Sequence, residues 1–203
     1  GGRRFTYKAF DAQINKLAGG LQDLGISKGD RVLVVLKNRL EMVALYWAVQ
    51  KIGAVFTPVN FRLSPEEVKY CMQNSEAKAV VYEPVCEKVV LEAAKGMKDL
   101  ALISVLGAEG GAVAYENLLA RGTGSFKRPE VSDDDICLML YTSGTTGKPK
   151  GVPRSHKNEY AAASAHIIQN RYEFKESTIG VMPLYHTMGM RSLLSMAFLN
   201  GKL

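Results

Sequence analysis

The chain has 203 residues, of which 47% are hydrophobic and 23% are charged. This composition is typical of an ordered domain with a sizeable core, and it excludes an intrinsically disordered chain. The net charge is +6, but basic and acidic residues alternate along the whole chain, which favours a local anion site and argues against a nucleic-acid groove.

The first half of the chain alternates between helix and strand patterns. Thr6 is a suitable N-cap for a helix whose apolar residues recur at steps of four and three, and Gly25 is suited to end that helix. The continuous apolar run over 31–36 predicts a strand that is buried on both faces. A helix over about 39–51 and a short strand over 54–57 follow.

The same alternation continues beyond residue 60. Ser64-Pro65-Glu66-Glu67 predicts a helix start, with a serine cap, a proline at the first position and a glutamate at the third. A strand over 78–82, a helix over about 84–97 and a strand over 100–106 come next. This order predicts a mostly parallel sheet with helices packed on its faces, so the expected fold class is a layered α/β domain.

Residues 107–132 change in character and are rich in glycine, which predicts a loop-rich connector with a short helix near 115–120. The apolar run over 136–141 then predicts a buried strand. We expect an α/β subregion over 1–106, the connector, and a phosphate-loop subregion over 133–203.

The stretch from 142 to 151 reads Thr-Ser-Gly-Thr-Thr-Gly-Lys-Pro-Lys-Gly and follows that buried strand directly. Glycines let backbone N–H groups turn toward an anion, hydroxyls donate hydrogen bonds, and lysines add positive charge. These properties predict a triphosphate site. A Walker A loop is excluded because Pro149 follows Lys148 where that loop needs Ser or Thr, so a P-loop kinase is disfavoured. A plain polar surface loop would not explain why strand, hydroxyls and lysines coincide.

These ten residues resemble the signature loop of the superfamily of acyl-CoA synthetases, adenylation domains and firefly luciferase. Further similarity at 25–34, 47–60, 155–158 and 182–189, in the family's order, extends the resemblance over nearly the entire chain. The resemblance implies a fold with two stacked sheets sandwiched by helices. It implies that residues 1–203 are an incomplete N-terminal AMP-binding domain, most like that of a fatty-acid–CoA ligase, without the C-terminal domain.

The resemblance also implies roles for individual residues. The loop residues that would contact ATP are Thr142, Ser143, Gly144, Thr145, Thr146, Gly147, Lys148 and Lys150. Lys148 would also stabilise the departing pyrophosphate, and His186 would lie near the acyl carboxylate and the α-phosphate, so these two are the expected catalytic residues. Tyr185 would line the acyl pocket together with His186. From the residues alone, each of three residues has a second interpretation. Lys150 is equally well explained as a solvated charge. The alternatives are a packing role for Tyr185 and a satisfied core side chain for His186.

The implied reaction is the ATP-dependent activation of a carboxylic acid, expected to be a fatty acid, followed by thioester formation with coenzyme A. ATP, coenzyme A and Mg²⁺ are therefore implied, with the Mg²⁺ ligands mostly outside this chain, and we expect the fragment alone to be inactive. Two alternatives stay open: an amino-acid or aryl-acid adenylation domain that loads a carrier protein, and a non-catalytic nucleotide-binding fragment.

The remaining candidate groups carry no predicted chemistry. Cys71, Cys86 and Cys137 are an odd number without metal-ligand spacing, which indicates free thiols of a reducing cytosol, and no metal ligand is expected. His156 is expected to be structural, because Ser155 before it can cap a helix. No apolar run reaches the roughly 20 residues of a membrane span, and we expect a cytoplasmic protein with both ends cut or processed.

Overall fold

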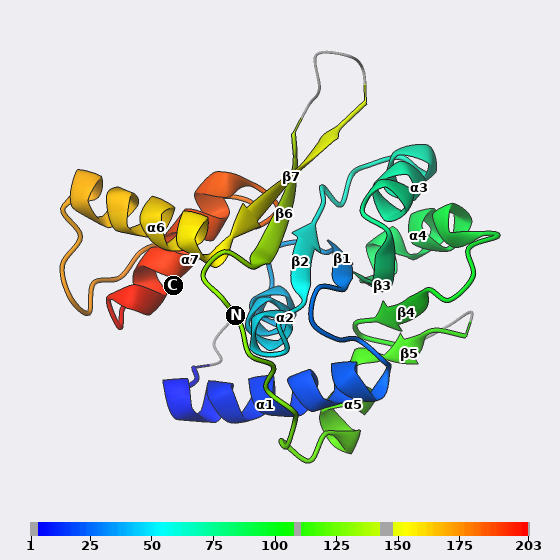
Figure 1. The fold of residues 1–203 in the computed structure, drawn as a ribbon, viewed down its shortest axis with the longest axis horizontal. Helices are drawn as coiled ribbons and strands as arrows, with labels where there is room; N and C mark the ends of the chain where they lie inside the picture. Colours follow the sequence, from blue (N-terminus) through cyan, green and yellow to red (C-terminus); the bar gives the residue numbers. More distant parts are fainter. Residues whose placement is uncertain (1–3, 108–110, 143–147, 203) are drawn as a thin grey trace.

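Seven strands form one sheet in the order β5-β4-β3-β1-β2-β6-β7 in the computed structural model, which describes residues 4–107, 111–142 and 148–202 (Figure 1). The strands are β1 (Arg31–Val35), β2 (Val55–Pro58), β3 (Ala77–Tyr82), β4 (Ala101–Ser104), β5 (Val113–Ala114), β6 (Ile136–Thr142) and β7 (Lys150–Ser155). Neighbouring strands are parallel except for the antiparallel pair β6–β7. The predicted α/β domain with a mainly parallel sheet is therefore confirmed. Of the two stacked sheets that the resemblance implies, the described residues form one.

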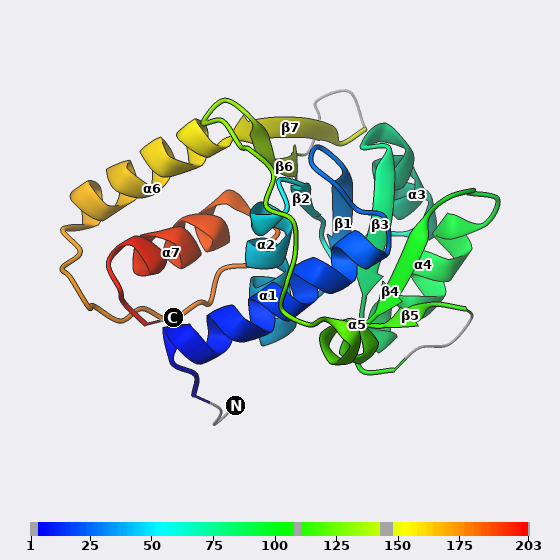
Figure 2. The same cartoon turned by 60° about the horizontal axis from the view of Figure 1, so that its bottom comes forward.

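Helices cover both faces of this sheet. They are α1 (Tyr7–Asp23), α2 (Leu40–Lys51), α3 (Pro65–Asn74), α4 (Glu87–Ala94), α5 (Tyr115–Arg121), α6 (His156–Asn170) and α7 (Thr187–Phe198). A 3₁₀ turn at Pro84–Cys86 precedes α4, so the helix predicted over 84–97 is shorter than expected. Figure 2 shows α6 and α7 side by side at one end of the molecule. No helix in the described part of the chain is long and apolar enough to cross a membrane.

Alternate residues of β1 face two separate cores. Val32 and Val34 lie in a core with α1 and α2, whereas Leu33 and Val35 lie in a core with α3 and α4. Successive side chains of a strand point to opposite faces of the sheet. The prediction that this strand is buried on both faces is therefore confirmed.

Side-chain caps are present at the helix starts that the sequence predicts. Thr6 accepts the N–H of Ala9, and Ser64 and Glu67 form a reciprocal capping box at α3. Ser155 caps α6 in the same reciprocal way. Each cap satisfies backbone N–H groups that have no partner within the helix, and so fixes where the helix begins.

The connections that leave the carboxyl ends of the strands run to different faces of the sheet. β1 leads into α2 on one face of the sheet, whereas its two neighbours, β2 and β3, lead into α3 and α4 on the other face. In open parallel sheets, ligands bind outside the carboxyl ends of strands where such connections diverge. The same edge receives the carboxyl end of β6, because β6 is parallel to β2.

Candidate functional site

The predicted phosphate loop connects the strands of a hairpin. Thr142 ends β6 and pairs with Lys150, the first residue of β7, so the loop leaves and re-enters the sheet at its carboxyl edge. Lys148 and Lys150 are exposed at the mouth of the hairpin. The predicted ATP contacts Ser143, Gly144, Thr145, Thr146 and Gly147 lie outside the described residues. A strand-loop-strand arrangement also differs from a Walker A loop, which opens a helix.

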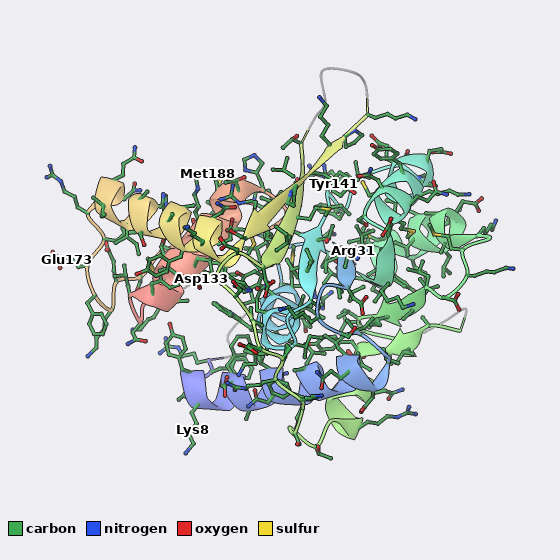
Figure 3. The ribbon with its side chains drawn as sticks, in the orientation of Figure 1. Lys8, Arg31, Asp133, Tyr141, Glu173 and Met188 are labelled. Atoms are coloured by element: carbon green, nitrogen blue, oxygen red, sulfur yellow. The ribbon has the colours of Figure 1, made fainter. Side chains whose placement is uncertain are left out.

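Helix α3 supports the base of this hairpin. The Tyr141 hydroxyl donates a 2.8 Å hydrogen bond to the side-chain oxygen of Asn74, at the end of α3. The Lys148 ammonium lies 5.6 Å from the centroid of the Tyr70 ring on the same helix, a cation–π distance. Gly151 lies opposite Tyr141, and a Cβ there would come within 3.3 Å of the Tyr141 ring. Figure 3 shows Tyr141 between the hairpin and α3.

His186 and Tyr185 lie at the start of α7. His186 is the N-cap of this helix: its Nδ1 accepts the Met188 N–H at 3.4 Å, and its ring is exposed. Tyr185 is half-buried. Backbone N–H groups without partners give a helix N-terminus a partial positive charge, which favours a nearby anion. The exposed His186 is therefore not the satisfied core histidine that the sequence also allowed.

Asn38, a residue that the sequence did not single out, connects this segment to the sheet. It lies between β1 and α2, and its amide nitrogen donates to the carbonyls of Gly180 at 3.2 Å and Met182 at 2.8 Å. Its side-chain oxygen accepts the Leu184 N–H at 2.8 Å. The sequence contained one signal for this residue: Asn38 is a short polar residue just after the carboxyl end of a buried strand, where ligands of parallel sheets bind.

The hairpin mouth and the His186 segment lie over the same edge of the sheet. Only β2 separates β1, which carries Asn38, from β6, which carries the loop, so these strands are about 10 Å apart. Among the described residues, no hydrogen bond or ion pair joins His186 to Thr142, Lys148 or Lys150. We call this carboxyl edge of the sheet, which carries the cationic hairpin mouth and the His186 helix start, the crevice.

Further cations line this edge. Lys37 and Arg62 follow the carboxyl ends of β1 and β2, and both lie over the ring of Phe61, at 5.6 Å and 5.1 Å. Together with Lys148 and Lys150 they give the crevice a positive field that attracts a polyanion. The described residues contain no group of three or more His, Cys, Asp or Glu that could hold a metal ion.

The cysteines contribute no nucleophile. Cys71, Cys86 and Cys137 are free and buried. Burial raises the pKa of Cys71 and Cys137 to about 12 and that of Cys86 to about 11. Since the thiolate is the reactive form, these thiols are unreactive near neutral pH.

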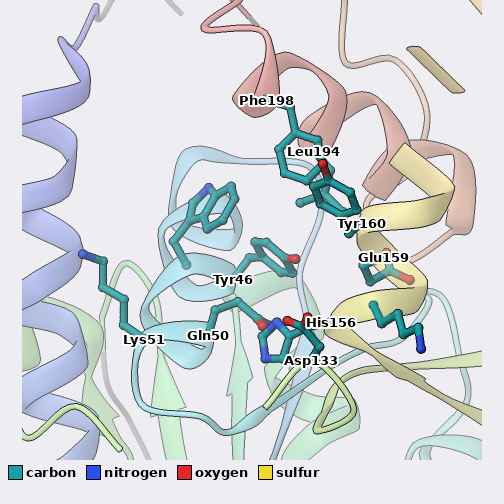
Figure 4. Close-up of a pocket in the computed structure, with 11 residues that line it drawn as sticks. Tyr46, Gln50, Lys51, Asp133, His156, Glu159, Tyr160, Leu194 and Phe198 are labelled. Carbon is teal, nitrogen blue, oxygen red and sulfur yellow. The ribbon is translucent and has the colours of Figure 1, made fainter. Parts of the chain in front are cut away.

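A separate cleft of about 600 Å³ opens between α2 and the α6–α7 pair (Figure 4). Tyr46, Gln50, Asp133, His156 and Tyr160 are among its lining residues. His156 follows the end of β7, next to the first residues of β6, so the cleft is at the opposite end of the hairpin strands from the loop. A seven-residue strand such as β6 spans about 20 Å. The cleft and the crevice are therefore different places on the molecule.

The sequence matches the AMP-binding enzyme family over residues 1–202, and the chain belongs to this family. It is 31% identical over 193 residues to the long-chain-fatty-acid–CoA ligase FadD13 of Mycobacterium tuberculosis, covering 94% of this chain and 37% of that ligase. It is 33% identical over 190 residues to the crotonobetaine/carnitine–CoA ligase of Salmonella enteritidis, covering 91% and 37%. The structure is similar to the inhibitor-bound N-terminal domain of FACL13 from Mycobacterium tuberculosis, with a TM-score of 0.87 and 27% identity.

That superposition covers 99% of this chain and 50% of the solved domain. The chain thus spans well under half the length of the ligases that it resembles and about half of one N-terminal domain. The resemblance inferred from the sequence motifs, and the assignment to part of an N-terminal domain, are confirmed.

Proposed function

We propose that the protein to which this chain belongs is an ATP-dependent acid–CoA ligase. It converts a carboxylic acid to an acyl-adenylate with release of pyrophosphate, and then to a coenzyme A thioester. The observation that carries the proposal is the cationic hairpin mouth at the carboxyl edge of the sheet, in a chain of the AMP-binding family. A fatty acid is the proposed substrate, because FadD13 is named for long-chain fatty acids.

The proposed first step is displacement at phosphorus. A carboxylate oxygen of the substrate attacks the α-phosphorus of ATP, a new phosphorus–oxygen bond forms, and the bond to the β-phosphate oxygen breaks. Pyrophosphate leaves with the bonding electrons, so negative charge grows on it. Lys148, with Lys150 and the hydroxyls of Thr142, Ser143, Thr145 and Thr146, would stabilise that charge.

His186 and Tyr185 have proposed roles on the acyl side of the crevice. His186, exposed at the positive end of α7, would contact the acyl carboxylate and the α-phosphate, and the half-buried Tyr185 would line the acyl pocket. Mg²⁺ would neutralise phosphate charge when bound, with ligands from outside the described residues. We also propose the subregions 1–106, 107–132 and 133–203, a cytoplasmic location, and inactivity of residues 1–203 alone.

The test is carboxylate-dependent exchange of pyrophosphate into ATP by the full-length protein. A panel of acetate, long-chain fatty acids, aryl acids and amino acids identifies the substrate class. Exchange is expected with fatty acids, and it should fall at least about tenfold in Lys148→Ala and Thr145→Ala variants because charge on the leaving group is less stabilised. Lys98→Ala, which removes an exposed cation far along the chain from the loop, serves as the matched control and should leave exchange unchanged.

The products separate the alternatives. Acyl-CoA formation supports the ligase, whereas transfer to a carrier protein with an amino or aryl acid supports the adenylation-domain alternative. A folded protein that binds ATP but exchanges pyrophosphate with no acid contradicts the ligase and favours a nucleotide-binding protein without this chemistry.

A further inference from the structure

We infer that Asn38 is a positioning residue for His186. It holds the segment over 180–184 against the carboxyl end of β1, and thereby sets where the His186 ring lies over the crevice. The inference rests on the proposed function, because the role of His186 in adenylation is itself proposed.

The Asn38 side chain uses both of its polar atoms on this segment. The amide nitrogen donates to the carbonyls of Gly180 and Met182, and the amide oxygen accepts the Leu184 N–H at 2.8 Å. These partners alternate along the backbone, as in the edge of a strand, so one side chain fixes five consecutive residues. A carboxylate or an alkyl group of similar size cannot make this set of bonds, because neither both donates and accepts.

Little else joins this segment to the sheet. Ile179 and Val181 are 80% and 74% exposed, so apolar packing holds them weakly, and Leu184 is the buried anchor at 5%. Asn38 makes three hydrogen bonds that connect this segment to the turn between β1 and α2. The Asn38 side chain and the buried Leu184 side chain therefore hold the segment over the end of β1.

The Glu83 carboxylate anchors the turn that carries Asn38. The Lys37 N–H donates to the Glu83 carboxylate at 2.5 Å, and the Arg39 guanidinium donates to the same carboxylate at 3.1 Å. Glu83 follows β3 and is 8% exposed. Asn38 is thus the exposed residue between two anchored neighbours, and the sheet holds its amide in place.

The connection from Asn38 to the imidazole is short. The His186 N–H donates to the Pro183 carbonyl at 3.0 Å, one residue before Leu184. Gly189 packs so closely that a Cβ there would lie 2.2 Å from the same carbonyl. A shift of residues 180–184 is therefore transmitted directly to the His186 backbone and to the first turn of α7.

A double-mutant cycle on the full-length protein tests this inference. Asn38→Ala should lower the turnover number of pyrophosphate exchange about tenfold, since an ångström of misplacement is costly in an active site. In a His186→Ala background the same change should have an effect below about twofold, because residues that act through one another are not additive. Asn38→Asp keeps the size and the acceptor but loses the donor, and should resemble Asn38→Ala.

Gln22→Ala is the matched control. Gln22 is a half-buried amide that also bonds a distant backbone, with 2.7 Å and 2.9 Å hydrogen bonds to Lys127, but it lies away from the crevice. Exchange should be unchanged in this variant. Asn38→Ala should have a melting temperature close to that of Gln22→Ala, because neither side chain belongs to a core and each is lost with two or three hydrogen bonds to backbone groups.

Amide hydrogen exchange gives a second readout that needs no activity. In Asn38→Ala the Leu184 amide should exchange at least about tenfold faster, since its hydrogen bond is lost, while amides of α1 should not change. Unaltered exchange at Leu184, or equal losses of turnover in the wild-type and His186→Ala backgrounds, overturns the inference. If the wild-type protein itself lacks pyrophosphate exchange, the proposed function fails, and hydrogen exchange alone then shows whether Asn38 holds the segment.

Discussion

The Tyr141 hydroxyl donates a 2.8 Å hydrogen bond to Asn74, and this contact ties the strand that enters the phosphate loop to the end of α3. The same hydroxyl lies 3.3 Å from the Cys71 carbonyl, also on α3. The outer strand of the hairpin, β7, is the edge of the sheet and pairs with β6 alone. This bond and the contact of Lys148 with the Tyr70 ring therefore both hold the hairpin mouth against α3.

We expect Tyr141→Phe to lower the free energy of unfolding by about 1 kcal/mol, the net value of a hydrogen bond whose partner stays partly solvated. The Michaelis constant for ATP should rise, because the loop is less well positioned. Urea unfolding and exchange kinetics of the full-length protein measure both effects. Tyr160→Phe is the control, since Tyr160 is 65% exposed and keeps its ring contact with Phe198. Equal stabilities of the two variants would contradict the role given to the Tyr141 bond.

Gly189→Ala should lower the free energy of unfolding, whereas replacement of a glycine by alanine within a helix ordinarily raises it. Alanine normally stabilises a helix by about 1 kcal/mol relative to glycine. Here the new Cβ would lie 2.2 Å from the Pro183 carbonyl oxygen and 2.9 Å from that of Met182. The backbone before His186 must move, so we expect a loss of roughly 1–3 kcal/mol in the free energy of unfolding.

Thermal unfolding of the full-length protein checks this expectation. Ser192→Ala in the same helix adds no volume, and its hydroxyl bonds only the Met188 carbonyl within α7, so it should change stability little. A Gly189→Ala protein as stable as this control would show that the close approach to Pro183 is not a constraint.

Most of the sheet could be predicted from the sequence, because its signals are local. The apolar run of β1 and the serine cap of α3 are read from neighbouring residues alone. β7 could not be predicted, because it contains Gly151 and Pro153 and most of its side chains are not buried. Proline is tolerated in such an edge strand, which lacks a partner on one side.

The sequence was sufficient to predict which residue types form the candidate site, but not how they are arranged in space. The loop motif indicates an anion site through its glycines, hydroxyls and lysines, whatever the rest of the fold. The contact of Asn38 with Met182 spans 144 residues and involves a backbone carbonyl, to which any residue type contributes equally. Sequence periodicity carries no information about such a partner, so the structure was needed to find it.

Removal of the glutamates that pair with Arg39 and Arg31 should lower the free energy of unfolding by unequal amounts. Glu83 accepts from Arg39 and from the Lys37 N–H, and its side chain is 11% exposed. Glu83→Ala leaves a mostly buried guanidinium with Glu41 alone and the amide without its acceptor, which should cost roughly 2–4 kcal/mol.

Glu76→Ala is the control for this change. Glu76 pairs with Arg31 at 2.8 Å, but its side chain is 83% exposed, so its removal should cost below about 1 kcal/mol. Urea unfolding of both variants gives the comparison. Similar losses would mean that burial does not set the value of the Glu83 pair.

The buried thiols predict a loss of stability at alkaline pH. An unfolded cysteine has a pKa near its ordinary value of 9.0, whereas burial raises the pKa of folded Cys71 to about 12. The folded state therefore holds the proton over a range in which the unfolded state has released it. Deprotonation of the unfolded chain favours unfolding, so the contribution of Cys71 is fully present below pH 9.0 and is lost as the pH rises toward 12.

Unfolding free energies measured from pH 8 to pH 11 in wild type and Cys71→Ala isolate this effect. The variant starts from a lower stability because it loses core volume, but its curve should fall less steeply by one proton over this range. Tyrosines and lysines titrate in both proteins, and their contribution cancels in the difference. Parallel curves would mean that the Cys71 thiol ionises equally in both states. Its complete burial on the inner face of α3 makes that unfavourable, because a thiolate there would lack solvent.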